Sequence, residues 1–417
     1  MTSQTQKRLQ LSHAQWVRVD FHLHTCADKE FTYSGAEDDF IDNYIDALEE
    51  AHIRLGIITN HNKFALNEFK KLRKQAKQRG IGLLPGVELS VNDGANGIHT
   101  LVVFSDEWLV NGDYINQFLN VAFKGKVPAE YEQNNGRSVL SLTDTIKELE
   151  SYEKDFFLVF AHVEASNGLW NELDGGRIGN LGKDESFRKY TLGFQKVRTY
   201  NDSKKGKVDR TKVKQWLQDW YPAEVEGSDP KSIKEIGQGE KCYVKLGELS
   251  FSALKFALSL PYSRLKREPP KHQGSYISSI RFEGGIFDGQ ELTFASELNT
   301  LIGIRGSGKS SILETIRYAL DIPWGEKSQD ITYKNNLIKH ALGSGGKVTL
   351  TAKDIYGQEF KISRILGESP NVYIDGKLQA GISIKETIIR KPIYFGQKDL
   401  SSTGDGFETD LVEKLVG

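Results

Sequence analysis

Residues 20–25 have the sequence DFHLHT and continue an alternation of apolar and polar residues that begins at Trp16. A period of two predicts a β-strand, which we expect to end in a turn at residues 27–29. The alternation places Asp20, His22 and His24 on one face of the strand, with the two imidazoles about 7 Å apart. Such a pair is half of a candidate metal site, although two strand histidines can also line an ordinary polar face.

The size and charge of the chain limit what it can be. Its 417 residues are too many for one compact core and predict two or three domains. It has 55 Lys and Arg against 56 Asp and Glu, so its net charge is −1. The chain as a whole therefore does not attract nucleic acid, and any such contact requires a local patch.

The two cysteines, Cys26 and Cys242, exclude a disulfide framework and a cysteine-rich zinc site. Residues 1–10 are polar and lack the apolar core of a signal peptide. No stretch approaches the roughly 18 apolar residues of a membrane span. We therefore expect a soluble cytoplasmic protein with no membrane contact.

Helical and strand periodicities alternate beyond the opening stretch. Apolar spacing predicts helices at residues 41–55, 63–78, 142–150 and 250–260, and strands at residues 55–59, 81–90, 98–104 and 156–160. Residues 105–155 form an insertion that contains the third of these helices. This alternation is typical of βαβ units and predicts an α/β fold with a mostly parallel sheet or barrel.

Side chains that can ligate metals recur where these strands start or end. Because parallel α/β folds gather their chemistry at the carboxyl ends of strands, we expect one shared site. Its candidate residues are His22, His24, His61, Glu88, His99, His162 and Asp229. Their nitrogen and oxygen ligands suit two or three ions of zinc, manganese or iron. Such ions clamp a phosphoester and lower the pKa of a bound water for attack on phosphorus. Cys26 has no evident partner base, and we interpret it as a packing residue.

These motifs resemble those of the PHP (polymerase and histidinol phosphatase) metallophosphoesterases. The resemblance rests on DFHLHT, ITNHN (58–62), GVE (86–88), His99, AH (161–162) and GSD (227–229), in that order. It implies a distorted seven-stranded β/α barrel over residues 16–266, after an N-terminal extension at 1–15. It also implies that the seven candidate residues hold two or three metal ions at one mouth of the barrel.

Two positions depart from the family pattern. The family usually has Asp where Asn60 stands, and its last motif usually ends in Asp-x-His where this chain has Asp229-Pro230-Lys231. A protonated lysine cannot ligate a metal and opposes one nearby. Either the barrel has decayed into a scaffold, or Lys231 replaces the charge of one metal and holds the substrate phosphate.

A basic run lies between Lys196 and Lys214, with eight Lys or Arg against Asp202 and Asp209. Such a run is an ordinary solvated face in one interpretation. In the other it contacts nucleic acid, because aromatic residues beside the charges can stack on bases. These aromatic residues are Tyr200, Trp216, Trp220 and Tyr221.

A linker at residues 267–275 precedes a second domain at 276–417. Strands are predicted at 276–282, 292–294, 298–302 and 392–395, and a hairpin at 348–366. Residues 303–311, GIRGSGKSS, match the P-loop pattern and are followed by a helix through Leu320. The predicted phosphate-binding residues are Gly303, Arg305, Gly306, Ser307, Gly308, Lys309, Ser310 and Ser311. Lys309 would bind the β- and γ-phosphates and Ser310 the Mg²⁺ of Mg-ATP.

This second domain resembles the N-terminal half of an SMC/ABC-type ATPase head, with Gln397 as its Q-loop glutamine. Gln397 is alternatively a lone loop residue. The family's coiled coil, signature motif, Walker B pair and switch histidine do not follow, so we interpret the chain as a fragment or expect another chain to supply them. A PHP barrel joined to such a head is similar to the TrlF-family AAA-like ATPases, which implies nucleic-acid processing or phage defence.

The leading hypothesis is a metal-dependent phosphoesterase, specifically a nuclease acting on DNA or RNA, gated by ATP at heads that form a homodimer. A second hypothesis is a catalytically impaired sensor that binds ATP and a partner protein. A third is a small-molecule phosphomonoesterase, which would have a closed pocket and no basic patch.

Overall fold

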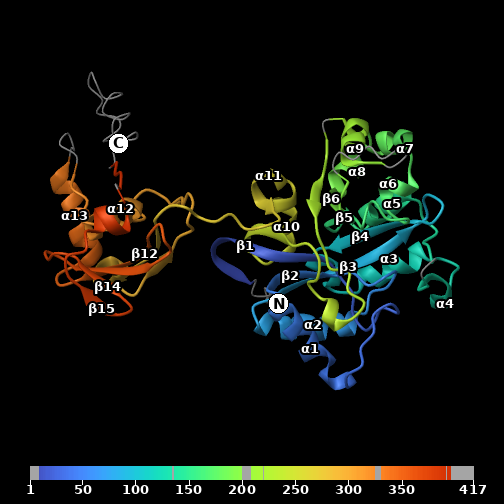
Figure 1. Ribbon diagram of the computed structural model, residues 1–417, viewed down its shortest axis with the longest axis horizontal. Coiled ribbons are helices and arrows are strands. Elements are labelled where there is room, and N and C mark those ends of the chain that lie inside the picture. The colour runs from blue at the N-terminus through green and yellow to red at the C-terminus, as the bar shows by residue number, and fades with distance from the viewer. Residues whose placement is uncertain are drawn as a thin grey trace. The chain divides into compact units, whose positions relative to one another are not determined.

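The computed structural model divides the chain into two compact units, Met1–Pro270 and Lys271–Gly417, which are described separately (Figure 1). The residues that the structure describes are 9–133, 136–199, 208–218, 220–324, 330–390 and 392–395. The division lies inside the predicted linker at 267–275. Within the described residues, no helix is long and apolar enough to cross a membrane.

The first unit is built on one sheet, which has nine strands in the described residues. The strands are β1 (Gln10–Leu23), β2 (Ile53–Ile58), β3 (Gly82–Val91), β4 (Ile98–Phe104), β5 (Phe156–Phe160), β6 (Thr191–Gln195), β7 (Ala223–Val225), β8 (Cys242–Glu248) and β9 (Leu265–Lys266). They lie in the order β7-β6-β5-β4-β3-β2-β1-β8-β9. The strands from β1 to β7 thus follow the chain order, as successive βαβ units require.

The sheet curls until its ends nearly meet. Strands β1, β2 and β3 are parallel, as are β5, β6 and β7, whereas β4 runs antiparallel to both of its neighbours. Beyond β7, the chain returns to β1: Phe21 N donates to Glu226 O at 3.2 Å, and Asp229 N donates to His22 O at 2.8 Å. The result is a mixed α/β fold around a nearly closed, barrel-like sheet, which confirms the predicted α/β class.

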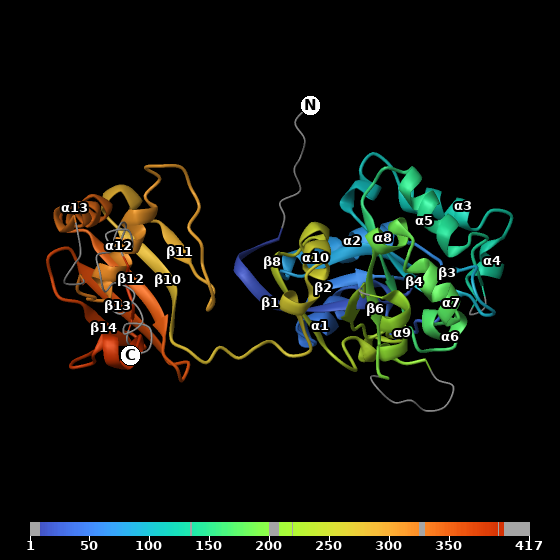
Figure 2. The ribbon, with the colours of Figure 1, turned by 90° about the horizontal axis from the view of Figure 1, so that it is seen from above.

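Helices pack around this sheet (Figure 2). They are α1 (Phe40–Glu50), α2 (Leu66–Gln78), α3 (Tyr114–Ala122), α4 (Pro128–Tyr131), α5 (Leu142–Ser151), α6 (Leu169–Glu172), α7 (Gly175–Leu181), α8 (Glu185–Tyr190), α9 (Arg210–Leu217), α10 (Phe251–Leu258) and α11 (Pro261–Arg264). The insertion at 105–155, for which one helix was predicted, contains α3 and α4 as well as α5. Its residues 114–122 bury Ile115, Phe118 and Leu119, a helical spacing that the prediction overlooked.

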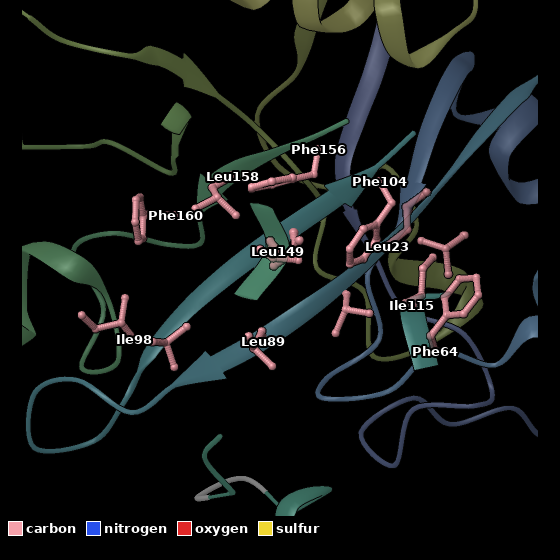
Figure 3. Close-up of a cluster of buried hydrophobic side chains, with 14 of the residues drawn as sticks. Leu23, Phe64, Leu89, Ile98, Phe104, Ile115, Leu149, Phe156, Leu158 and Phe160 are labelled. Atoms are coloured by element: carbon pink, nitrogen blue, oxygen red, sulfur yellow. The ribbon is translucent and has the colours of Figure 1, made fainter. Parts of the chain in front are cut away.

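Alternate residues of the strands pack into two different hydrophobic clusters. Phe156, Leu158 and Phe160 of β5 pack outward with side chains of the covering helices, such as Leu149 of α5 (Figure 3). Phe157 and Val159 of the same strand belong to the second cluster, which includes α10. Because both faces of β5 are buried, its sequence FFLVF is continuously apolar, as in a buried parallel strand.

The second unit has a six-stranded antiparallel sheet in the described residues, in the order β11-β10-β12-β13-β14-β15. Its elements are β10 (Tyr276–Glu283), β11 (Glu291–Thr293), α12 (Lys309–Ala319), α13 (Ile331–Leu342), β12 (Lys347–Lys353), β13 (Glu359–Ile365), β14 (Asn371–Ile374) and β15 (Lys377–Gln379). Side chains of α12 and α13 join those of β10, β12 and β13 in one core cluster. The predicted hairpin is confirmed by the antiparallel pairing of β12 with β13.

Two strand predictions in this unit are wrong. Residues 298–302, before the P-loop, and residues 392–395 are not in strands. Leu298, Ile302 and Ile304 are 93%, 91% and 83% exposed, so the apolar run has no sheet neighbour among the described residues. A strand forms only when another strand pairs with it, and composition alone does not provide that partner.

Candidate metal centre

The seven predicted ligand residues converge on one mouth of the curled sheet. His22 lies on β1, Glu88 on β3 and His99 on β4. The remaining four lie outside the strands: His24 just after β1, His61 after β2, His162 after β5 and Asp229 after β7. The five residues other than His162 and Asp229 bury more than nine-tenths of their surface, and those two are half-buried.

An irregularity in β1 turns the two histidines toward this mouth. The pairing of β1 with β2 shifts register between Asp20 and Leu23, and Phe21 and Leu23 pack in different clusters. The simple alternation therefore breaks at His22. Asp20 binds the returning loop: its carboxylate accepts hydrogen bonds from Ser228 N, Ser228 Oγ and His22 N. It thereby holds the backbone beside the histidines.

Glu88 is the centre of the site. Its Oε1 lies 2.7 Å from His99 Nδ1 and 3.2 Å from His162 Nε2, and its Oε2 lies 3.1 Å from His22 Nε2. Although burial opposes ionisation, the neighbouring His22 and His99 rings hold the pKa of Glu88 well below its usual range. The Glu88 carboxylate is thus ionised and is shared between two sets of imidazoles.

Two groups of three ligand atoms have the spacing of metal sites. His22, His24 and Glu88 form one, and Glu88, His99 and His162 the other, with the atoms of each group within 4.8 Å of one another. His22 Nε2 is buried and has no hydrogen bond among the described residues, although it faces Glu88. A buried nitrogen of this kind, in a nitrogen and oxygen donor set, fits a divalent transition metal.

Residues that the sequence reasoning missed orient these ligands. Gln195 Oε1, on β6, lies 3.0 Å from His22 Nδ1 and accepts from His162 N at 3.3 Å. A donor at His22 Nδ1 leaves Nε2 as the lone-pair nitrogen that faces Glu88. Asn167 Nδ2 lies 3.0 Å from His99 Nε2.

Asp28 performs the same role for His24. Its Oδ2 lies 2.8 Å from His24 Nδ1 and accepts from His61 N at 2.6 Å. Burial disfavours a charged imidazole, but hydrogen bonds to Asp229 and Asp28 raise the pKa of His24 to about 9. Burial likewise opposes ionisation of Asp28, yet its contact with His24 lowers the pKa of Asp28 to about 2. In the metal-free protein the attraction between the His24 imidazolium and the Asp28 carboxylate therefore holds this pair together.

Asn60, which departs from the family pattern, has a structural role. Its Oδ1 accepts from Thr25 N and its Nδ2 donates to Thr25 Oγ1, both at 2.8 Å. It thereby fixes the turn that follows His24. The neighbouring His61 ring points into the site, 5.0 Å from the His99 ring, and burial lowers the pKa of His61.

The Asp229 end of the site carries lysines. Asp229 Oδ1 lies 3.1 Å from His24 Nε2 and 3.0 Å from Lys231 Nζ, and Oδ2 lies 3.2 Å from Lys196 Nζ. Lys231 Nζ also pairs with Glu30 at 2.5 Å. Burial opposes ionisation of Asp229, but the nearby His22 and His24 hold its pKa far below the usual range. Burial also works against a charged Lys231, but Asp229 and Glu30 raise its pKa.

Backbone strain and one close approach maintain this geometry. His162 and Asp229 have positive φ angles of 28° and 54°, in a region that non-glycine residues avoid at a cost of about 1–3 kcal/mol each. At Gly227 a Cβ atom would lie 2.6 Å from His22 Cβ and 2.7 Å from His22 N. Only glycine allows the loop after β7 to pass this close to β1.

These residues surround a cavity of about 400 Å³. Its walls include Glu88, His61, His99, His162, Asp229 and Lys231. A cavity of this volume holds a small ligand or one nucleotide-sized group.

The described part of the basic run is paired and packed. Arg198 makes two hydrogen bonds to Glu226, at 2.7 and 2.8 Å, and Arg210 pairs with Glu224. Trp216, Trp220 and Tyr221 pack against the core cluster of the unit. These three rings are half-buried, so part of each ring is used in packing. Tyr200 and Lys204, Lys205 and Lys207 lie outside the described residues.

The predicted P-loop, residues 303–308, is an exposed loop that leads into α12. Gly306 and Gly308 have φ angles of 82° and 88°, as expected of a tight glycine turn. Lys309 Nζ donates to the carbonyl oxygens of Gly303 and Ile304, at 2.6 and 2.9 Å, and lies 3.3 Å from Ser307 Oγ. Arg305 is exposed, and Ser310 and Ser311 occupy the first turn of α12. Gln397 lies outside the described residues.

No protein-family model matches the chain, and no curated protein matches it. Similar solved structures include PsfC from Pseudomonas syringae, with 14% identity over 58% of this chain and 88% of that chain and a TM-score of 0.34. A protein from Bifidobacterium adolescentis, described as a candidate metal-dependent phosphoesterase, has 12% identity over 58% and 95% of the two chains and a TM-score of 0.37. An amidohydrolase from Chromobacterium violaceum, described with bound sulfate and no metal, has 16% identity over 53% and 90% and a TM-score of 0.32.

Proposed function

We propose that the first unit is a metal-dependent phosphoesterase of the PHP kind. The observation that carries the proposal is the Glu88 carboxylate, which lies within 3.2 Å of nitrogens of His22, His99 and His162. A carboxylate shared between two imidazole sets suits a pair of divalent ions. Zinc, manganese and iron all suit these ligands.

Each group of ligands has a defined role in this proposal. His22, His24 and Glu88 would hold one ion, and Glu88, His99 and His162 the other, with His61 and Asp229 at the two flanks. When bound, such ions polarise a phosphoester and lower the pKa of a water molecule. The chain itself contributes the fixed orientation of the imidazoles, through Gln195 and Asp28, and a partly buried cavity that limits water around the reacting phosphoryl group.

We further propose that the natural substrate is a nucleic acid, either DNA or RNA, and that the second unit binds Mg-ATP at residues 303–311. The glycine turn and Lys309 at the start of α12 support this interpretation of the loop. By resemblance to TrlF-family proteins, nucleotide-dependent pairing of two heads would gate cleavage, in nucleic-acid processing or phage defence.

One observation favours a different substrate class. The cavity is about 400 Å³, and Lys196, Arg198 and Arg210 of the basic run are ion-paired, so a small phosphomonoester fits the site as well as the end of a nucleic-acid strand. Parallel assays with a phosphomonoester, single-stranded DNA and RNA distinguish the two classes, since turnover of the monoester alone would exclude the nuclease.

Hydrolysis by the whole chain in the presence of Mn²⁺ tests the proposal. The double substitution His22→Ala/His24→Ala should reduce hydrolysis to the level of the chelated protein, whereas nucleotide binding should persist. His340→Ala, at an exposed histidine of α13, is the matched control and should behave like the parent. Full hydrolysis by the double variant would show that this site is not the catalyst. Bound metal with no turnover of any phosphoester would instead favour the sensor hypothesis.

A further inference from the structure

The Asp229 end of the cavity contains two ammonium groups where the predicted ligand set expects a third cation. Lys231 Nζ and Lys196 Nζ lie on different oxygens of Asp229, at 3.0 and 3.2 Å. The third contact of this carboxylate is His24 Nε2, at 3.1 Å. Both carboxylate oxygens of Asp229 are thus already paired with nitrogen donors.

We propose that Lys231 and Lys196 replace a third metal ion and that Lys231 binds the non-bridging oxygens of the substrate phosphoryl group. This inference rests on the proposed phosphoesterase function and deepens it. It assigns phosphoryl recognition to Lys231 and gives Lys196, which the sequence places only in the basic run, a supporting role beside Asp229.

The hydrogen-bonding capacity of Lys231 supports the assignment. An ammonium group has three N–H donors. The described contacts of Lys231 Nζ use two of them, on Asp229 and Glu30. Lys231 also lines the cavity, as do His61 and Glu88, so its remaining donor is available to an anion bound there. Two carboxylates thus hold the ammonium group in place without exhausting its donors.

Lys196 offsets part of the negative charge around Lys231. Lys231 Nζ faces two carboxylates, those of Asp229 and Glu30, and Lys196 lies on the second oxygen of Asp229. The Lys196 backbone has a positive φ of 58°, in the region that non-glycine residues avoid. Its position directly after β6, next to Gln195, places Lys196 at the same mouth as the ligands.

The arrangement also separates this role from metal binding. Neither of the two three-ligand groups includes Asp229, the carboxylate that holds both lysines. Removing the Lys231 charge should therefore weaken phosphate binding while the ions around Glu88 remain bound. If Lys231 had a merely structural role, its loss would lower metal content and phosphate affinity together.

The test uses the metal-loaded full chain and inorganic phosphate as the probe. Lys231→Met should keep the parent metal content, measured by elemental analysis, and weaken phosphate binding about tenfold or more, measured by calorimetry. Lys231→Arg, which keeps a charged donor, should restore binding to within about threefold of the parent. Lys196→Met should weaken phosphate binding less than Lys231→Met, because it does not contact the ligand.

Lys255→Met is the matched control. Lys255 is a part-buried lysine of α10 that pairs with Asp155, just before β5 and so at the opposite end of the strand from His162. It should bind metal and phosphate like the parent. Thermal unfolding of every variant shows whether it is folded, and Lys231→Arg provides the comparison should Lys231→Met unfold.

The outcomes separate this inference from the proposed function. Metal-replete, active parent protein with unchanged phosphate affinity in Lys231→Met would overturn the inference and leave the phosphoesterase intact. Loss of metal from Lys231→Met would also overturn it, since Lys231 would then support the metal site. A parent protein that binds no metal would contradict the proposed function itself.

Discussion

The two candidate phosphate sites differ in how completely the fold prepares them. In the first unit, the imidazoles around Glu88 are oriented by Gln195 and Asp28 before any ligand binds. In the second unit, Lys309 donates to the carbonyl oxygens of its own loop, at Gly303 and Ile304. Lys309 has to leave these bonds to reach a phosphate, whereas the ligands around Glu88 need only exchange protons for metal.

The surroundings of the two sites show the same difference. The curled sheet and the returning loop at Gly227 surround the first site, and five of its seven candidate ligands are buried. The segment before the P-loop exposes Leu298 and Ile302, with no strand beside it among the described residues. We infer that metal binding depends on the first unit alone, whereas the P-loop needs further contacts to reach its working conformation.

The largest effect is expected from Glu88→Gln, which removes the shared charge with little change in shape. Both three-ligand groups lose their carboxylate, so metal content and hydrolysis should fall together to background. Elemental analysis and a phosphoester assay measure the two quantities. Glu283→Gln, at an exposed glutamate of β10 paired with Lys347, is the control. Metal retention by Glu88→Gln would contradict the contrast between the preorganised metal site and the P-loop, because metal binding would then not depend on the central ligand Glu88.

A smaller effect is expected from Asp28→Asn, which weakens the support of His24 and keeps the direct ligands. Loss of such a supporting carboxylate typically reduces metal affinity about 10–100-fold. A metal titration should show this loss, and saturating metal should restore hydrolysis. Asp46→Asn, at an exposed carboxylate paired with Arg79, should titrate like the parent. An unchanged titration curve for Asp28→Asn would mean that the histidines are oriented without Asp28.

Lys309→Ala tests the second site of the comparison, the P-loop of the second unit. It should lower affinity for a fluorescent ATP analogue about tenfold or more, because a charge-assisted contact to phosphate is lost. Metal content should not change, since the two sites lie in different units. Lys347→Ala is the control, at a lysine paired with Glu283. A parallel loss of metal in Lys309→Ala would refute the independence of the first site.

The smallest effect is the pH dependence of the metal-free protein. His24 has a pKa raised from 6.5 to about 9, so its contribution to stability is complete below pH 6.5 and is lost as pH rises through 9. The loss is at most about 1.4 kcal/mol per pH unit. With metal bound, the slope should reverse, because metal requires neutral imidazole and protons compete with it. Thermal unfolding with and without chelator measures both slopes, and equal slopes would contradict metal binding by His24.

Much of the first site was predictable, because its ligands follow strands whose sequences are strongly periodic. Strand β5 was predicted with its observed limits, Phe156–Phe160, and His162 after it lies 3.2 Å from Glu88, another of the predicted ligands. The supporting residues were not predictable in the same way. Gln195 contacts His22 across 173 positions of sequence, and no local pattern indicates such a contact. Asp28, four positions after His24, was the one supporting residue with a local signal.

The failures have a common physical cause. In one interpretation of the basic run its aromatic residues stack on bases, but Trp216, Trp220 and Tyr221 are half-buried and pack in part against the core. The apolar residues at 298–302 were expected to pair in a sheet, but they are exposed. In both segments the composition indicates which local structure or contact the residues favour. Tertiary contacts decide which side chains are buried.

The most direct test of the central claim is the metal content of the full chain, measured by elemental analysis after purification without chelator. The account predicts two divalent ions per chain, one for each three-ligand group around Glu88. It also predicts that chelation removes them and abolishes phosphoester hydrolysis. Fewer than one tightly bound ion per chain, or hydrolysis that survives complete removal of metal, would contradict it.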